Sequence, residues 1–448
     1  MNRKVLKVSL IAALGGLLFG FDTAVISGTT EALTKVFSLT PSSLGFTVAI
    51  ALIGTILGAV FVGYPANSYG RKNTLKMIAL LYFFSSLGTA MAWNWGVFLT
   101  FRFLGGIAVG ASSVVAPMYI AEIVPASFRG RMVALAQFNV VFGILLAFFS
   151  NLIISNVITG PAQWRCMLGI LAVPSIIFFG LLYLIPFSPR WLASKGRVEE
   201  AGSIIKYLAG PEDNAEKALK EIVDSIKSDS QSKNEKLFST KYTKVILLAV
   251  AIAAFNQLSG INAVLYYAPY IFKMAGAGTN AALIQSVVVG FTNLIFTMAA
   301  LLVIDKLGRR KLMLTGSLGY IVSLGALTVI FAAQGSVFSP LGGALVLASL
   351  VVFIASHAFG QGAVIWVFIS EIFPTKVRAQ GSALGSFTHW IMAAVISWTF
   401  PIFANISGAV IFGVYTFFMV LQLLWVIFIM PETKGIPLEK MTKELGIE

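Results

Sequence analysis

An acidic residue, Asp22, stands inside the first long apolar run, in the segment GGLLFGFDTAVISG at residues 15–28. An ionisable side chain there is energetically expensive, which makes it a functional-site hypothesis with a partner to be found. Arg102 is the basic residue placed well inside another apolar run. A carboxyl group buried alone favours its neutral form, whereas one beside a guanidinium is charged. Separating or joining this pair would therefore move a proton, and a fixed ion pair that only holds helices together is an equal alternative.

The composition places the chain among membrane proteins. Of its 448 residues, 58% are hydrophobic and 11% are charged, far from soluble globular usage. The basic residues behind the formal net charge of +14 lie mostly on alternate loops. This distribution indicates membrane topology and excludes a nucleic-acid partner. Cys166 is the single cysteine, so no intramolecular disulfide is expected. With His357 and His389 as the only histidines, no nucleophile-and-base set and no metal site is predicted, which argues against an enzyme.

Twelve apolar runs are long enough to cross the hydrocarbon core of a bilayer. They cover residues 6–28, 44–66, 75–93, 97–121, 131–155, 166–186, 244–273, 281–304, 311–333, 341–370, 381–404 and 408–430. The basic loops lie on one side of these runs, together with both ends of the chain and residues 187–243. Both termini are therefore expected in the cytoplasm.

The polar stretch 187–243 contains apolar residues at helical spacing between Ala215 and Ile226. This spacing predicts an amphipathic helix, which needs a surface to lie on. We interpret the stretch as a linker between two membrane halves, with a docking site for a regulator as the weaker alternative.

Two loop motifs recur in the second half of the chain. NSYGRK at residues 67–72 returns as DKLGRR at 305–310, and EIVPASFR at 122–129 returns as EIFPTKVR at 371–378. Because both copies fall in cytoplasmic loops, the halves have the same orientation, a parallel repeat with a substrate site at mid-membrane. The predicted domains are an N-terminal six-helix half at 1–186, the linker at 187–243, a C-terminal six-helix half at 244–430 and a cytoplasmic tail at 431–448.

The acids and arginines of these motifs predict ion pairs across the seam between helix bundles, which close the cytoplasmic side and part when it opens. We call this set the cytoplasmic latch; its residues are Arg71, Glu122, Arg129, Arg309, Glu371 and Arg378. The alternative, that the arginines only fix topology, leaves the paired acids unexplained.

Seven segments, in chain order, carry a resemblance to a known family. They are GGLLFGFDTAVISG (15–28), PMYIAEIVPASFRGR (117–131), PFSPRWL (186–192), NQLSGINAVLYYAP (256–269), DKLGRR (305–310), SEIFPTKVR (370–378) and PETKG (431–435). The chain resembles the sugar porter family of the major facilitator superfamily over essentially its whole length. The similarity is strongest to bacterial xylose–proton symporters, with facilitative glucose carriers more distant. The resemblance implies an all-α membrane protein with the twelve-helix major facilitator fold.

The resemblance also implies roles for individual residues. Asp22 matches the proton-coupling carboxylate of family symporters and Arg102 its arginine partner, and relatives that act as uniporters commonly have a neutral residue at the first position. The family's sugar-contacting positions match Gln137, Asn256, Gln257, Asn262, Asn293, Gly362, Trp366 and Trp390, and its aromatic gate matches Phe19, Tyr266 and Tyr267. Amides that both donate and accept suit the hydroxyls of a neutral sugar, and indole rings cover its C–H face. Amides that only join helices are the alternative.

Three positions depart from the family pattern. Phe187 replaces the glutamate of PESPR, which weakens one arm of the predicted latch. Ile144 and His389 replace amides, so the sugar cannot be copied from the xylose symporters. His389 could titrate near neutral pH, although an ordinary hydrogen-bonding histidine is the more common case.

The expected function is import of a monosaccharide, such as xylose or glucose, by proton symport with alternating access. A facilitative sugar uniporter is the nearest alternative and a membrane sugar sensor a remote one. The expected partners are the sugar, the proton and the lipid bilayer, with no cofactor. We expect a monomer in a plasma membrane, as in the inner membrane of bacteria.

Overall fold

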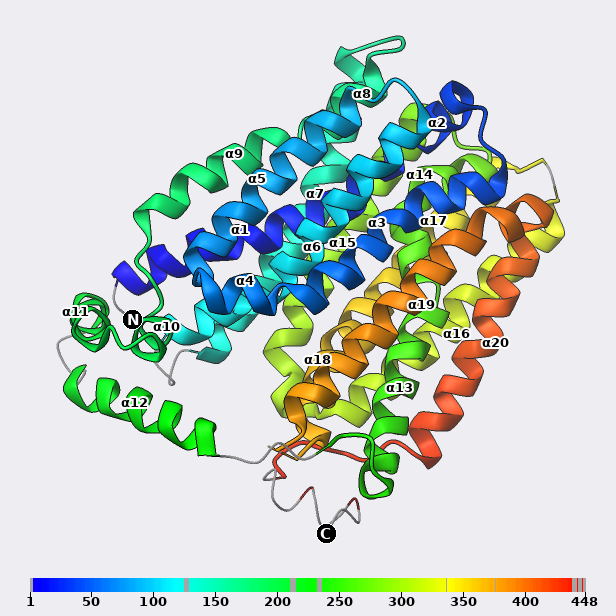
Figure 1. Cartoon of the computed structure of the whole chain (residues 1–448). Coiled ribbons are helices and arrows are strands. Elements are labelled where there is room, and N and C mark those ends of the chain that lie inside the picture. Colours follow the sequence, from blue (N-terminus) through cyan, green and yellow to red (C-terminus); the bar gives the residue numbers. More distant parts are fainter. Residues whose placement is uncertain are drawn as a thin grey trace. The chain divides into compact units, whose positions relative to one another are not determined.

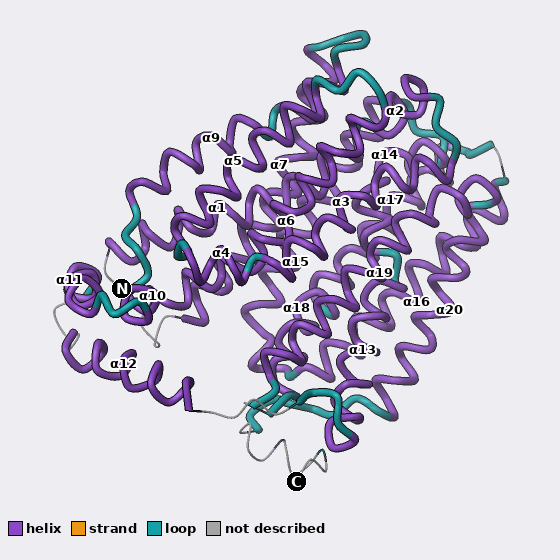
Figure 2. Tube along the Cα trace, viewed as in Figure 1, coloured by secondary structure: helices purple, strands orange, loops and turns teal. Residues whose placement is uncertain are grey.

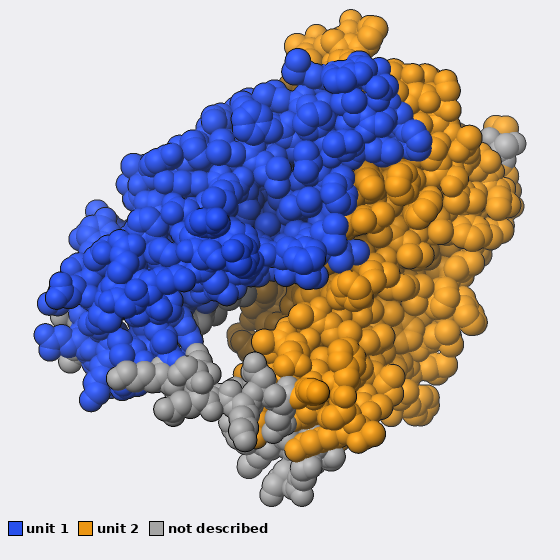
Figure 3. All heavy atoms as spheres, viewed as in Figure 1, with its two compact units in different colours: residues 1–22, 54–144, 168–233 blue, residues 23–53, 145–167, 234–448 orange. Residues whose placement is uncertain are grey.

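The computed structural model describes residues 3–124, 129–209, 215–231, 236–335, 337–374 and 376–436, together with residues 441 and 445. Within these ranges the regular structure is helical throughout and contains no strand (Figure 2). Two compact units form: unit 1 comprises residues 1–22, 54–144 and 168–233, and unit 2 comprises residues 23–53, 145–167 and 234–448 (Figure 3). The predicted boundaries at residues 186 and 244 are therefore not those of the compact units, and the two six-helix halves stay a prediction.

Figure 1 labels the helices of both units. Those that lie in unit 1, or begin there, are α1 (Arg3–Val25), α4 (Gly63–Ser68), α5 (Arg71–Ala90), α6 (Trp95–Ile123), α7 (Arg129–Val157), α9 (Ala172–Leu181), α10 (Pro189–Ser194), α11 (Val198–Leu208) and α12 (Ala215–Gln231), with the 3-10 turn η3 (Leu182–Leu184). The last residues of α1 and α7 belong to unit 2.

The remaining helices lie in unit 2 or begin there. They are α2 (Thr30–Phe37), α3 (Pro41–Phe61), α8 (Gln163–Gly169), α13 (Thr243–Leu258), α14 (Ile261–Met274), α15 (Thr279–Leu307), α16 (Arg309–Gln334), α17 (Pro340–Phe359), α18 (Gln361–Ile372), α19 (Arg378–Ile406) and α20 (Gly408–Phe428), with the 3-10 turns η1 (Ile26–Gly28) and η4 (Thr240–Tyr242).

Eleven segments of the described chain are long and apolar enough to cross a membrane. The predicted run at 75–93 is the twelfth and forms α5, whose first turns carry Lys72, Asn73 and Lys76 and are less hydrophobic. The chain is thus a multi-pass membrane protein, and all twelve predicted runs are helical. The amphipathic helix predicted between Ala215 and Ile226 is confirmed as α12, and the linker contains two further helices, α10 and α11, whose positions were not predicted.

Two of the predicted spans are broken by glycine. Gly260 has φ +84°, a left-handed conformation that ends α13 and lets α14 begin in a new direction. Inside α14, Tyr267 is also non-helical, two residues before Pro269, whose ring disfavours helix continuity. The second break, at Gly360 between α17 and α18, was not predicted. A β-carbon there would lie 2.8 Å from the Cα of Gly316, so the break also permits close helix contact.

Small residues bring α1 and α7 together in unit 1. A β-carbon at Gly20 would lie 1.8 Å from the carbonyl oxygen of Val140, and one at Gly143 would lie 2.2 Å from that of Leu17. Such contacts need glycine, and they are a common device of membrane helix packing. They hold the part of α1 that carries Asp22.

Candidate functional site

The structure brings Asp22 of α1 and Arg102 of α6 together inside unit 1. Arg102 Nη1 donates a hydrogen bond of 2.9 Å to Asp22 Oδ1. The two residues are 4% and 3% exposed, and Arg102 Nε is buried without a partner among the described residues. Breaking a buried pair by neutralising one member is costly, because the other charge stays buried and alone. Protonation of Asp22 would therefore leave the guanidinium of Arg102 buried without its counter-charge.

The surroundings of this pair are tightly packed. A β-carbon at Gly105, one turn after Arg102 on α6, would lie 2.5 Å from Ser85 Oγ and 3.8 Å from Asp22 Oδ1. Ser85 Oγ is itself tied to the carbonyl oxygen of Phe101. Gly105 thus leaves the space that the hydroxyl group of Ser85 occupies beside the carboxylate of Asp22.

A second polar centre forms in unit 2, where α13 ends and α14 begins. Gln257 Nε2 donates to Asn256 Oδ1 at 2.8 Å, and Asn262 Nδ2 donates to Gln257 Oε1 at 2.9 Å. The break at Gly260 places these amides together, since an unbroken helix would turn Gln257 away from Asn262. We call these three residues the amide cluster; its donors and acceptors match the hydroxyls of a sugar.

His389 of α19 extends the amide cluster. Its ring nitrogens lie 3.3 Å from Gln257 Nε2, and its ring centroid is 4.9 Å from each of the rings of Trp366 and Trp390. Trp366 is 40% exposed, so its indole has a free surface beside these polar groups. From the sequence, His389 was noted only as a departure from the family pattern. Its position just before Trp390 was the available signal that it could belong to the sugar site.

The other predicted sugar-binding residues are less connected. Asn293 of α15 is buried and accepts a hydrogen bond of 3.4 Å from Thr297, which suits a structural role as well as a binding one. Gly362 of α18 faces His357, whose ring would lie 3.1 Å from a β-carbon there. Gln137 is half-buried on α7 in unit 1, and its part in a sugar site stays a prediction.

Among the residues of the predicted aromatic gate, Tyr267 has well-defined contacts in unit 2. The Tyr267 hydroxyl donates to the carbonyl oxygen of Ser397 at 3.0 Å, and its ring stacks on Phe400 with centroids 5.0 Å apart. Tyr266 is buried next to it, while Phe19 lies half-buried on α1 in unit 1. Tyr267 is thus held by both a hydrogen bond and a ring stack.

Two ion pairs form among the latch residues, each inside one unit, and the predicted pairing across the seam between helix bundles stays a prediction. In unit 1, Arg71 donates through Nε and Nη2 to Glu122 Oε1, at 3.0 and 2.8 Å. In unit 2, Arg309 donates through Nε to Glu371 Oε2 at 3.1 Å and through Nη2 to Glu371 Oε1 at 2.8 Å. Arg378 donates to the carbonyl oxygen of Phe373, and the side chain of Arg129 lies outside the described residues. The role of these residues as a latch stays a prediction.

In each latch pair, a hydroxyl group donates a further hydrogen bond to the glutamate. Ser188 Oγ donates to Glu122 at 2.5 Å, and Thr433 Oγ1 donates to Glu371 at 2.6 Å. The repeat therefore extends to PFSPR and PETKG, in which Phe187 and Glu432 hold matching positions. Sequence reasoning found both segments but did not align them with each other.

No group of three or more metal-ligating side chains occurs among the described residues. A bundle of membrane-spanning helices, with a buried ion pair in one unit and a cluster of neutral hydrogen-bonding groups in the other, defines a membrane carrier. The comparisons with known proteins identify which kind.

A family profile described as "Sugar (and other) transporter" matches residues 8–445. The D-xylose-proton symporter of Escherichia coli K12 is 37% identical, over 98% of this chain and 95% of the relative. The arabinose-proton symporter of Bacillus subtilis is 35% identical over 98% and 94%, and the glucose transport protein of Synechocystis is 34% identical over 98% and 97%. The chain belongs to the sugar transporter family and is a transporter rather than an enzyme.

Solved structures agree. The inward open conformation of the xylose transporter XylE from E. coli matches with a TM-score of 0.86 at 36% identity, over 98% of this chain and 99% of that one. XylE bound to 6-bromo-6-deoxy-D-glucose, described as a major facilitator superfamily proton:xylose symporter, matches with a TM-score of 0.80 at 36% identity, over 99% of both chains. The predicted twelve-helix major facilitator fold is confirmed, as is the similarity to bacterial xylose–proton symporters.

Proposed function

We propose that this protein imports a monosaccharide, a pentose or hexose such as xylose or glucose, by proton symport. The observation that carries the proposal is the buried pair of Asp22 and Arg102. The xylose and arabinose relatives are likewise named as symporters of a sugar and a proton.

The proposed cycle is alternating access by the two predicted six-helix halves. Protonation of Asp22 removes the charge that holds Arg102, and binding of sugar to the amide cluster, His389 and the two indole rings favours the next conformation. Tyr267 closes the outer side and the pairs of Arg71 and Arg309 close the cytoplasmic side. We expect each pair to weaken when the cytoplasmic side opens, because its two residues lie near helix ends.

We also propose a topology, a membrane and an oligomeric state for the protein. We place both termini in the cytoplasm, because the basic loops and the ends of the chain share one side of the predicted topology. An energised plasma membrane, such as the bacterial inner membrane, supplies the proton gradient. The transporter would work as a monomer with the proton as coupling ion and no cofactor.

The test is uptake of radiolabelled xylose and glucose into proteoliposomes, with and without an inward proton gradient. Asp22→Asn should abolish accumulation while counterflow exchange of sugar continues, because the variant mimics a permanently protonated carboxyl group. Asp224→Asn, on the exposed face of α12, is the matched control and should accumulate sugar as the native protein does. Equal uptake by the native protein with and without the gradient would instead indicate a uniporter.

A further inference from the structure

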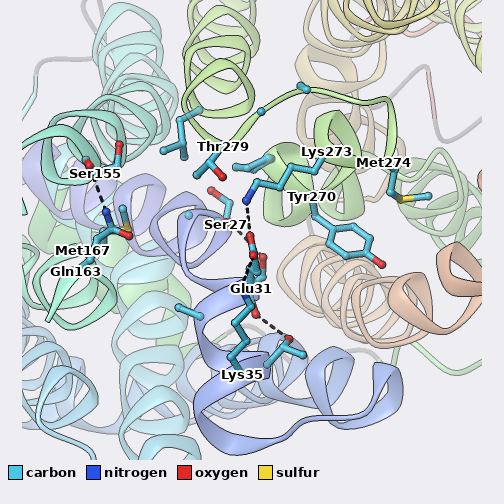
Figure 4. A pocket seen from close by; sticks show the side chains of 18 of the residues that line it. Ser27, Glu31, Lys35, Ser155, Gln163, Met167, Tyr270, Lys273, Met274 and Thr279 are labelled. Atoms are coloured by element: carbon cyan, nitrogen blue, oxygen red, sulfur yellow. Dashed lines mark hydrogen bonds and ion pairs between the residues drawn. The ribbon is translucent and has the colours of Figure 1, made fainter. Parts of the chain in front are cut away.

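A cavity of about 680 Å³ opens in unit 2 (Figure 4), and no residue of the amide cluster belongs to its lining. Most of the residues that line it come from η1, α2, the start of α8, the end of α14 and the start of α15. The lining includes Ser27, Glu31, Lys35, Gln163, Tyr270, Lys273 and Thr279. In the proposed topology, all these segments lie on the outer side of the membrane.

Charged groups line one side of the cavity. Glu31 accepts a hydrogen bond of 2.7 Å from Lys35 and a further short one from Lys273 on α14. The hydrogen bonds from Lys273 and then Lys35 hold the pKa of Glu31 below its ordinary value. Glu31 is therefore ionised at neutral pH, and the cavity offers a strong acceptor beside two ammonium donors.

A buried hydroxyl group faces the same space. Ser27 is 1% exposed and lines the cavity, and its Oγ has no hydrogen-bond partner among the described residues. A buried polar atom without a partner is unfavourable, so a ligand that hydrogen-bonds to it gains affinity. Gln163 donates at 2.9 Å to the carbonyl oxygen of Ile158, which leaves its own side-chain oxygen available.

The inner wall of the cavity is continuous with the aromatic gate. Tyr270 lines the cavity, and its ring centroid is 6.4 Å from that of Tyr267 and 6.5 Å from that of Phe400. A molecule in the cavity would therefore rest on the ring next to the aromatic gate. Tyrosine rings suit the C–H face of a sugar.

We propose that this cavity is a second, outer binding site for a neutral monosaccharide, which holds the sugar before the aromatic gate opens. The inference rests on the proposed transport function and on the proposed orientation. A ligand with many hydroxyls can use Ser27, Glu31 and the lysines at once, because each hydroxyl both donates and accepts. The side chains of Glu31 and Lys35 are 51% and 75% exposed, so water competes and the site binds weakly.

The test uses a thiol as reporter. In a Cys166→Ser background, which removes the single native cysteine, Thr279→Cys places a thiol at the cavity wall. Labelling by a membrane-impermeant maleimide is timed with increasing D-xylose, and betaine at equal osmolality serves as the solute control. Val337→Cys, at a residue that is 80% exposed and outside the cavity lining, is the matched control thiol. Xylose at about twice its dissociation constant should slow labelling at the cavity about threefold and leave the control unchanged.

Further variants separate the two sites. Gln257→Ala, in the amide cluster, should impair uptake while xylose still protects the thiol at residue 279. Ser27→Ala should raise the half-protecting concentration about threefold and Glu31→Gln about tenfold, since hydrogen bonds to charged groups are stronger. Labelling needs no transport, so each variant gives a readout even when uptake fails.

Any of three results would overturn the outer site. One is protection that disappears with Gln257→Ala, which would trace it to the amide cluster. Another is protection that Ser27→Ala and Glu31→Gln both leave unchanged. The third is a complete lack of protection. If the native protein accumulates sugar but xylose never protects the thiol, only the outer site fails. If the native protein moves no sugar, the proposed function itself fails.

Discussion

The carboxylate of Glu432 accepts a hydrogen bond of 2.9 Å from the backbone N–H of Arg309, at the start of α16. It accepts a second, of 3.1 Å, from the N–H of Arg310, so it caps the helix from outside the helix's own sequence. In the first half of the chain the matching position is Phe187, which stacks on Trp191 and lies 5.2 Å from the Lys72 ammonium. The two matching positions are thus used differently, one for capping a helix and one for packing.

Removing this cap should destabilise the protein. Glu432→Gln keeps the shape but loses the charge that favours the positive end of α16, and we expect a loss of about 1 kcal/mol. Thermal unfolding in detergent measures it, with Glu221→Gln, exposed and in the middle of α12, as the control. An unchanged midpoint relative to the control would show that the cap contributes nothing.

The contribution of Glu432 should depend on pH. Burial disfavours its charged form, but the backbone N–H groups of Lys434, Arg309, Arg310 and Thr433 together lower its pKa below the ordinary value of 4.5. A lowered pKa in the folded state means that the stabilisation is present above the unfolded value and is lost as the pH falls through the folded value. The difference between native protein and Glu432→Gln should therefore be constant above about pH 5 and shrink below pH 4.5. A difference that grew on acidification would contradict this assignment.

The pair of Asp22 and Arg102 should show strong coupling. Asp22→Asn leaves a buried guanidinium alone and should cost about 3 kcal/mol or more. Adding Arg102→Met to it removes the orphan charge and should restore most of that loss. A double-mutant cycle of thermal stability measures the coupling, and additive effects would mean that the two charges do not interact in the membrane.

The break at Gly260 should tolerate no side chain. Gly260→Ala would combine a positive φ with a β-carbon 2.4 Å from the ring of Tyr415. We expect a loss of about 3 kcal/mol and weak sugar binding, because the amide cluster depends on this turn. Gly160→Ala is the control, since its φ is +81° but the space around it is open. It should cost only about 1 kcal/mol. Equal losses would show that the contact with Tyr415 is unimportant.

His389 should contribute to sugar affinity but not to proton coupling. His389→Ala removes the group that lies 3.3 Å from Gln257 and should weaken sugar binding about tenfold. The ratio of accumulated sugar with and without the proton gradient should be unchanged once uptake is saturated. Parallel measurements of KM and of this ratio separate the two effects, and a lost gradient response would give His389 a part in coupling.

Much of this fold could be predicted because the membrane limits what a sequence can do. Backbone groups in hydrocarbon must bond internally, so long apolar runs become helices, and the twelve runs did. The pairing of Asp22 with Arg102 followed from the same constraint, since two buried charges in otherwise apolar helices have few other partners. The arginine and glutamate partners of the latch pairs were found through the internal repeat.

Other features depended on tertiary packing. The break at Gly360, between α17 and α18, lies in close contact with Gly316. The sequence around Gly360 did not predict it, because it is one continuous apolar run. His389 meets Gln257 only because α19 packs beside the turn at Gly260. The cavity at Ser27 and Glu31 is built from segments far apart in the chain. A sequence determines which residues must be buried, but which faces meet is decided only when all the helices pack at once.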